Sequence, residues 1–250
     1  MNWLRRILLV LTVLLLGPLL TVSCGSINLG ADWRTANRDS AKLAPFPAEH
    51  PEAVVQVYSA RAFNWRGIFA VHTWISTKPA GAKHYTVHQV MGWNLRHGLP
   101  VVVSEPDLPD RLWYNAKPRI ITDLRGAEAE AAIPKVIAAV QNYPYADAYR
   151  LWPGPNSNTF TAYVGRQVPD LRLELPPTAI GKDYLANAAL FGSAPSGTGF
   201  QISLLGMVGA MAAVKEGLEV NLLGLVFGVD PLGPAIKLPS IGRLGFSLDE

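Results

Sequence analysis

Two neighbouring stretches decide the fold: residues 68–75, IFAVHTWI, and residues 85–90, YTVHQV. Both are rich in β-branched and aromatic side chains, which is typical of strands. The turn-forming segment KPAG at 78–81 separates them. Consecutive strands with so short a connection pair antiparallel. The two stretches therefore predict a β-hairpin, and each strand carries a histidine, His72 in the first and His88 in the second.

Similar strand-forming runs lie on both sides of this hairpin. Together with it, the predicted strands are 53–59, 67–77, 84–93, 100–104 and 119–124. Turn signals separate them, and the connections are short, so an antiparallel meander is favoured over a parallel sheet.

Two helices are predicted after the strands. Between 126 and 142 the apolar residues recur at intervals of three and four, the period of one helix face, and Pro134 must begin this helix or kink it. A shorter helix runs from Ser157 to about Arg166. It follows the sequence PGP at 153–155, and Asn and Ser occupy its capping positions.

The last third of the chain is apolar and rich in glycine. Residues 200–214 carry no charge, and residues 218–229 carry almost none, with a Lys-Glu-Gly turn between the two runs. This pattern predicts a long hairpin, with a packed helical pair as the alternative. The hairpin either completes a buried core or forms a surface patch that touches lipid or a partner.

The N-terminus has the pattern of a targeting segment. Arg5 and Arg6 precede a run of 16 uncharged, mostly apolar residues at 7–22, which matches a secretory signal and is short for a spanning helix of about 20. Cys24 follows in LTVSCG, which resembles a bacterial lipobox and implies lipidation of Cys24. A plain signal anchor with a chance cysteine is the alternative. Both interpretations place the remaining chain in the cell envelope, anchored to the membrane and facing the periplasm or exterior.

Composition narrows the function classes. Hydrophobic residues make up 49% of the chain and charged residues 16%, which suits one large core with an appended subdomain. Without residues 1–23, 20 Lys and Arg face 19 Asp and Glu, and no basic cluster indicates a nucleic-acid partner. The single cysteine excludes a disulfide framework and a cysteine-rich zinc site. The histidines lack metal-ligand spacing, so no metal and no cofactor is expected.

Catalytic chemistry is indicated around Ser157. A hydroxyl in the first turn of a helix lies near unpaired N–H groups and the positive end of the dipole, which activate a nucleophile and stabilise an oxyanion. The alternative is that Ser157 or Asn156 only caps the helix. His72 lies among bulky apolar residues and must be hydrogen-bonded or have a task. Period-two geometry can place His72 and His88 on the same face of the sheet.

Residues 72–166 resemble the circularly permuted papain-like proteins, which include the NlpC-type peptidases and the lecithin:retinol acyltransferase-like enzymes. The similar points are HTWI at 72–75, YTVH at 85–88 and NSNTF at 156–160. The glycine after the first histidine is absent, and a serine replaces the catalytic cysteine. The resemblance implies Ser157 as the nucleophile, His72 as the general base and His88 as the orienting group. Backbone N–H groups near Ser157, with Asn156 and Asn158, would hold the oxyanion. Residues 156–160 and 217–224 also resemble a bacterial domain-of-unknown-function family, which implies no activity.

The predicted architecture is an α+β fold, with an antiparallel sheet packed on helices in the permuted papain-like manner and an added glycine-rich apolar hairpin. Its parts are a signal, lipobox or anchor at 1–24, a tether at 25–51, the core at 52–175 and the C-terminal extension at 176–250. The leading hypothesis is an envelope hydrolase or acyl/amide transferase that forms a covalent acyl intermediate, with lipid or cell-wall peptide as substrate. The alternative is a non-catalytic, membrane-tethered binding protein with a degenerate papain-like cleft.

Overall fold

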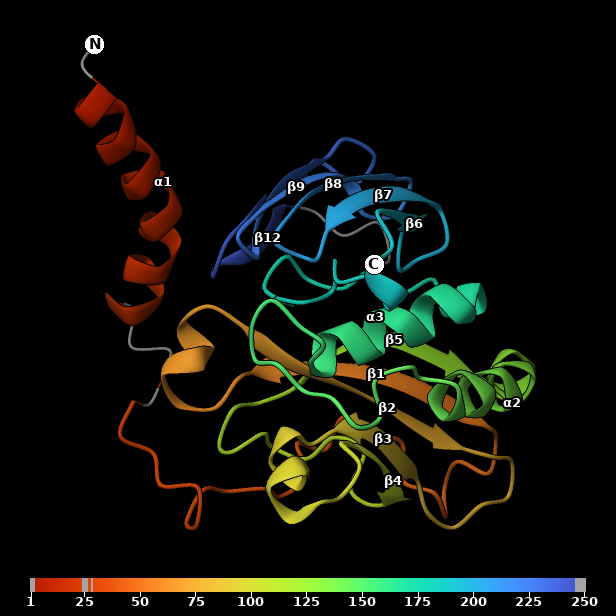
Figure 1. The fold of residues 1–250 in the computed structure, drawn as a ribbon. Helices are drawn as coiled ribbons and strands as arrows, with labels where there is room; N and C mark the ends of the chain where they lie inside the picture. Colours follow the sequence, from red (N-terminus) through yellow and green to blue (C-terminus); the bar gives the residue numbers. More distant parts are fainter. Residues whose placement is uncertain (1–2, 24–26, 28, 246–250) are drawn as a thin grey trace.

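The computed structural model describes residues 3–23, 27 and 29–245. Within them lie two antiparallel sheets and three α-helices, α1 (Trp3–Ser23), α2 (Gly126–Gln141) and α3 (Ser157–Gln167) (Figure 1). The prediction of an α+β protein built on antiparallel sheets is confirmed. In this part of the chain no helix is both long and apolar enough to cross a membrane.

The first sheet has five strands in the order β4-β3-β2-β1-β5. They are β1 (Val54–Arg61), β2 (Val71–Lys78), β3 (Thr86–Val90), β4 (Val102–Pro106) and β5 (Arg119–Arg125). The first four form the predicted meander, and β5 returns to pair with the free side of β1.

One face of this sheet packs against α2 and α3, and we call it the helix face. Val57, Ile75, Val136 and Phe160 belong to its buried cluster. The apolar period of α2 was predicted from sequence, but the helix begins well before Pro134, so the proline lies inside it. Burial of these apolar side chains stabilises the sheet–helix layer, since each contributes about 1.5–3 kcal/mol when it leaves water.

The opposite face, the loop face, packs against an aromatic cluster that includes Tyr58, Trp74 and Trp113. Part of the predicted tether also packs on the fold. The buried carboxylate of Asp110 accepts hydrogen bonds from the Ser40 hydroxyl and from two backbone N–H groups of residues 43 and 44. Residues 40–47 are therefore part of the globular structure and not a free linker.

The second sheet is a seven-stranded meander in the order β12-β11-β10-β9-β8-β7-β6. Its strands are β6 (Phe191–Ser193), β7 (Gly199–Leu204), β8 (Val208–Ala213), β9 (Gly217–Leu222), β10 (Leu225–Asp230), β11 (Ala235–Leu238) and β12 (Gly242–Gly245). Each arm of the predicted long hairpin is in fact two strands, β7 and β8 in the first arm and β9 and β10 in the second, and only the turn between β8 and β9, which pair from Ala213↔Gly217 onward, lies where the hairpin turn was predicted. The alternative of a packed helical pair is wrong, and so is the expectation of a buried apolar hairpin, because many apolar side chains of these strands are exposed.

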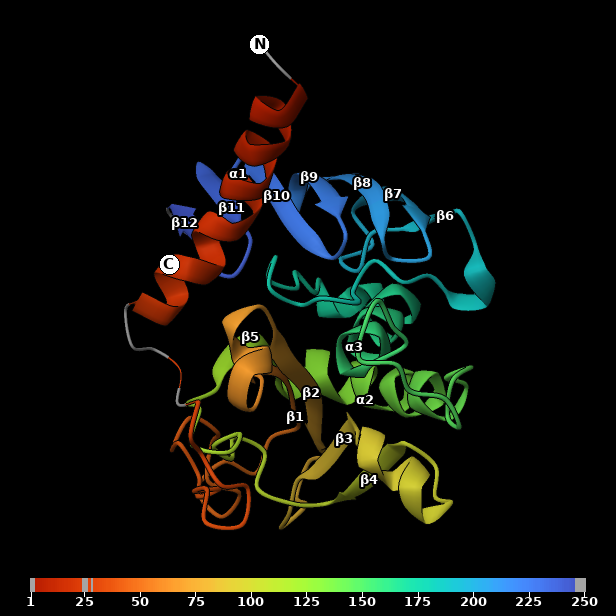
Figure 2. The same ribbon diagram turned by 60° about the vertical axis from the view of Figure 1, so that its left-hand side comes forward.

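The two sheets meet at α3 and at the segment that follows it (Figures 1 and 2). Leu173, Leu175 and Ala179 still belong to the helix-face core, and the N–H of Val71 in β2 donates to the carbonyl of Thr178. The core therefore continues beyond the predicted boundary at 175, and the second sheet begins only at β6. Short 3-10 helices connect the elements at Asn64–Ile68, Gly92–His97, Pro169–Leu171 and Ala186–Ala188.

Candidate functional site

Ser157 is the first residue of α3, and the residue before it caps the helix. The Asn156 side-chain oxygen accepts hydrogen bonds from the N–H groups of Asn158 (3.0 Å) and Thr159 (3.2 Å), and the Thr159 hydroxyl accepts one from the Asn156 N–H, which completes a capping box. The Asn156 carbonyl accepts the N–H of Phe160. Most of the N–H groups that could stabilise an oxyanion at this helix end are thus already bonded.

The two asparagines have no free amide proton for a ligand. Asn156 Nδ2 donates to the carbonyls of Leu151 and Ile180. Asn158 Nδ2 donates to the carbonyls of Val71 and Ile180, and its side-chain oxygen accepts the hydroxyl of Thr73. An amide nitrogen has two protons, so each is saturated. These bonds join α3 to β2 and to the segment after α3, which is a structural role.

His72 lies on the loop face, away from α3. Its cross-strand partner is Ala60 of the loop-face cluster, and its ring stacks on Trp113 with centroids 3.7 Å apart. Its neighbour Thr73 points the other way, with its hydroxyl oxygen 3.3 Å from the carbonyl oxygen of Ser157. Burial lowers the pKa of His72 to about 3, an effect that the nearby Gln89 side chain opposes only in part, so the ring is neutral at pH 7.

His88 lies on the helix face, with both ring nitrogens occupied. It pairs across the strands with Ile75. Nε2 is 3.0 Å from the Thr77 hydroxyl, and Nδ1 is 2.8 Å from the Ser104 hydroxyl. Burial lowers the pKa of His88 to about 4. His88 is therefore a neutral, hydrogen-bonded histidine of the sheet.

The prediction that both histidines share one face is wrong. His88 is opposite Ile75, and Ile75 is three residues from His72, an odd number that reverses the side-chain direction along a strand. The sheet itself therefore lies between His72 and the helix that carries Ser157. The Ser157 hydroxyl makes no hydrogen bond to any described residue. The structure therefore does not bring Ser157, His72 and His88 together as nucleophile, base and orienting group.

Two further expectations concern residues outside this region. Cys24, with its expected lipidation, lies outside the described residues. Over the residues that the structure does describe, no three His, Cys, Asp or Glu side chains gather closely enough to hold a metal ion.

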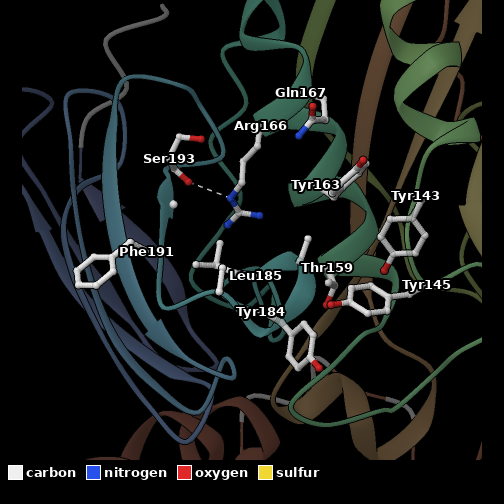
Figure 3. A pocket seen from close by; sticks show the side chains of 13 residues that line it. Tyr143, Tyr145, Thr159, Tyr163, Arg166, Gln167, Tyr184, Leu185, Phe191 and Ser193 are labelled. Atoms are coloured by element: carbon white, nitrogen blue, oxygen red, sulfur yellow. Dashed lines mark hydrogen bonds between the residues drawn. The ribbon is translucent and has the colours of Figure 1, made fainter.

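A cavity of about 220 Å³ lies on the other side of α3, between this helix and β6 (Figure 3). Four tyrosines line one wall: Tyr143, Tyr145, Tyr163 and Tyr184. Their rings form an edge-to-face series in which neighbouring centroids are 5.4–5.8 Å apart. This geometry is favourable for aromatic pairs and makes the wall rigid.

Arg166, near the end of α3, forms the polar end of the cavity. Its Nε donates to the carbonyl of Ser193 at 2.9 Å, and Nη2 donates to the Lys182 carbonyl and to Gln201 Oε1. Its Nη1 donates to no described residue. Burial lowers the pKa of Arg166 to about 10, with Asp183 and Glu216 opposing the shift, so the guanidinium keeps its charge at pH 7.

The tyrosine hydroxyls divide into bonded and free groups. Tyr163 donates to the Asn142 carbonyl at 2.9 Å, and Tyr145 accepts the N–H of Asn187 at 2.8 Å. The Tyr143 hydroxyl has no partner among the described residues, and burial raises its pKa, so it stays protonated. A ligand in this cavity would thus meet a fixed cation and a free hydroxyl beside an aromatic wall.

A second hollow, of about 470 Å³, lies between residues 40–47 and the loops around 83–85 and 106–110. Its hydroxyl groups are engaged, because the Ser40 hydroxyl binds Asp110 and the Tyr85 hydroxyl donates to the Pro45 carbonyl. Its basic side chains, Lys83 and His84, are exposed and are not held in place by hydrogen bonds to described residues. The tyrosine-lined cavity is therefore the stronger candidate.

Sequence reasoning missed this cavity, although a signal was present. Three of the four tyrosines that line the cavity fall between 143 and 163, a stretch that holds four of the eight tyrosines of the chain. In the sequence, Arg166 indicates only the approximate end of a helix. The pairing of these residues with β6 depends on the second sheet, whose position no local pattern indicates.

Fold and site together define an α+β protein of two antiparallel sheets with an aromatic, cationic cavity between them. A family model described as "Protein of unknown function (DUF3750)" matches residues 52–184, and the chain belongs to this family. The matched region covers the first sheet, α2, α3 and the segment after α3. Neither the curated proteins nor the solved structures include a match to this chain.

Proposed function

We propose that this protein is a non-catalytic, membrane-tethered binding protein of the cell envelope. Its ligand occupies the tyrosine-lined cavity and pairs an anionic group with Arg166. The observation that carries the proposal is the free Nη1 of Arg166, a charged donor held in place by three hydrogen bonds and facing a cavity. Donors fixed in this way bind phosphate or carboxylate strongly.

The cavity limits the size of the ligand. Its volume of about 220 Å³ is below the roughly 300–1,000 Å³ of sites for drug-sized molecules. A headgroup-sized phosphate or carboxylate compound fits this volume, with its carbon skeleton against the tyrosine rings. The membrane tether remains an expectation from the N-terminal sequence.

The acyl-transfer hypothesis, in which Ser157 forms a covalent acyl intermediate, remains a prediction. The separation of Ser157 from His72 and the saturated amides of Asn156 and Asn158 favour the binding function over it. The order of motifs supports a relation to the permuted papain-like fold, with a site that no longer has its catalytic arrangement. We expect no labelling by a fluorophosphonate probe, because a serine hydroxyl needs a positioned base to attack. Labelling that is lost in Ser157→Ala would restore the enzyme hypothesis.

Titration of the full chain in detergent with inorganic phosphate, glycerol phosphate and butyrate tests the binding function, with glycerol as the uncharged control. The anions should bind and glycerol should not. Ala189→Trp fills the cavity from an exposed position and should weaken binding roughly tenfold or more, a change of at least ~1.4 kcal/mol. The matched control is Ala127→Trp, an exposed alanine at the start of α2 outside the cavity. Binding that is equal in both variants, or absent for every anion, would contradict the proposal.

A further inference from the structure

The second sheet places polar side chains inward and apolar side chains outward. On β9 the inward residues are Glu219 and Asn221, whereas Leu218, Val220 and Leu222 are exposed. Cross-strand partners share a face, so the pairings place the exposed apolar side chains of neighbouring strands on one outward face, while the inward face combines polar residues with the buried Met211 and Val226. A one-sided sheet in water has the reverse arrangement, with its apolar side chains on the covered face.

The outward face of the strands carries no charged side chain. Its members, which cross-strand pairing brings together, are Phe191, Ser193, Phe200, Ile202, Leu204, Val208, Ala210, Ala212, Leu218, Val220, Leu222, Leu225, Phe227, Val229, Ile236, Leu238 and Leu244. Ser193 is the one polar residue among them. We call this set the apolar sheet face.

The inward face is held by a buried ionic network. Lys182 forms an ion pair with Glu219, and Lys237 pairs with Glu219 at 2.9 Å and with Glu174 at 2.6 Å. Asn221 donates to Asp183 at 2.8 Å. Because charges are costly to bury unpaired, these contacts fix which face of the sheet meets the core. Turning the sheet over would lose every one of them, so the outward direction of the apolar sheet face is determined by the fold.

The size of the apolar sheet face reaches the upper end of what a soluble monomer normally exposes. Seven strands spaced by about 4.8 Å, each of up to six residues, cover a sheet of roughly 30 Å by 20 Å. This corresponds to about 600 Å² of nearly continuous apolar surface, the upper limit for a typical monomer. Exposed apolar residues in the turns, such as Leu223 and Leu232, extend it further.

α1 stands against one edge of this sheet and projects beyond it. The Thr21 hydroxyl is 3.4 Å from the carbonyl of Ser240 in the β11–β12 turn. At Gly17 an added Cβ would lie 2.1 Å from the Pro239 carbonyl oxygen, so only glycine allows this close approach. Both views show the N-terminal end of α1 rising past the sheet on the side away from the first sheet (Figures 1 and 2). The side chains of Trp3, Leu16 and Leu19 on α1 are also apolar and exposed.

From these observations we infer that the apolar sheet face lies on a lipid bilayer, in contact with the acyl chains beside α1. The inference goes beyond the proposed ligand-binding function. A protein partner or a second copy is less compatible, because protein interfaces have a polar rim and about one hydrogen bond per 100–200 Å². The apolar sheet face offers one polar side chain, Ser193, for such bonds. Lipid tails need none, and they match a surface with a single polar side chain.

Depth-dependent fluorescence quenching tests the inference on the full chain. In a Cys24→Ser background, Leu218→Cys carries an environment-sensitive nitrobenzoxadiazole label on the apolar sheet face. The matched control is Leu99→Cys, a leucine of nearly equal exposure (55% against 54%) in the loop before β4, at the other end of the molecule. Both proteins are reconstituted into vesicles of phosphatidylethanolamine and phosphatidylglycerol, with and without doxyl groups on the acyl chains.

The doxyl lipids should reduce the emission of the label at 218 by roughly half and leave the label at 99 nearly unchanged. A second label at Phe200→Cys on β7 should behave like the label at 218, since both residues share the face. Equal, weak quenching at 218 and 99 would overturn the inference. A label at 218 that is shielded from iodide but not quenched by doxyl lipids, with disulfide cross-links between copies, would also overturn it and identify a second copy as the partner.

Discussion

β2 of the first sheet and β9 of the second both lie between two neighbouring strands, yet they bury different residues. All eight residues of β2 are buried, whereas β9 alternates strictly between buried and exposed. β2 has α3 on one face and an aromatic cluster on the other, so both faces leave water. β9 has protein on one face only. The residues that it buries are polar, and those that it exposes are apolar.

The difference shows that a strand pattern reports how many faces are covered, but not by what. The first sheet is stabilised mainly by apolar burial, with polar ties such as Thr73 to Asn158 at its contact with α3. The second sheet is attached to the core by ion pairs and amide contacts, and its apolar side is exposed, which leaves it available for contact with lipid. Substitutions on the two sheets test this difference.

The largest effect is expected at Glu219, which pairs with two buried lysines, Lys182 and Lys237. Glu219→Ala should lower the free energy of unfolding by about 4 kcal/mol, because it leaves buried ammonium groups with weakened partners. Urea denaturation of the purified protein measures this. Leu218→Ala, one residue earlier on the outward face, is the control and should change stability by about 0.5 kcal/mol or less. Similar losses in the two variants would show that the outward face is covered by protein.

A smaller loss is expected when a buried isoleucine of the first sheet is truncated, in contrast to an exposed isoleucine of the second sheet. Ile75→Ala in β2 should cost about 3 kcal/mol, since it opens a cavity in the helix-face core. Ile202→Ala on β7 removes an exposed side chain and should cost less than about 0.5 kcal/mol in detergent-free solution. Denaturation midpoints of the two variants test the contrast, and a loss at Ile202 equal to that at Ile75 would contradict the described exposure.

The smallest effect concerns the pH dependence of the first sheet. The folded pKa of His72, about 3, is below the unfolded value of about 6.5, so the unfolded chain binds a proton that the folded chain excludes. The resulting stability is present above pH 6.5 and is lost as pH falls toward 3. Between pH 7 and pH 5 this loss is about 2 kcal/mol for His72.

Stability curves of the wild type and His72→Gln at the two pH values measure this contribution. The wild type should lose about 2 kcal/mol more than the variant over this interval. His84→Gln, at an exposed histidine, controls for the substitution. The comparison isolates His72 from the buried carboxyls of Asp183 and Glu216, whose raised pKa values act in the opposite direction. Parallel curves for wild type and His72→Gln would show that the ring reaches water.

Much of the first sheet could be predicted because its information is local. Residues rich in Val, Thr and Trp, short turns and the capping pair at 156–157 place strands and α3 close to their observed bounds. The site could not be predicted in the same way. The faces of His72 and His88 depend on the pairing register, and a shift of one residue reverses every side chain. The saturation of Asn156 depends on the carbonyls of Leu151 and Ile180, the second of which comes from a segment after the helix.

The sequence alone determined the antiparallel strands, the capped start of α3, the change of period in α2 and the apolar character of residues 200–229, because each follows from neighbouring residues. Tertiary structure alone decided three features: which histidine faces which layer, the Arg166 cavity and the outward direction of the apolar sheet face. These features depend on contacts between residues far apart in the chain, such as Lys182 with Glu219 and Arg166 with Gln201. Alternation along a strand separates two sets of side chains, but the partner that covers one set decides which of them meets the core.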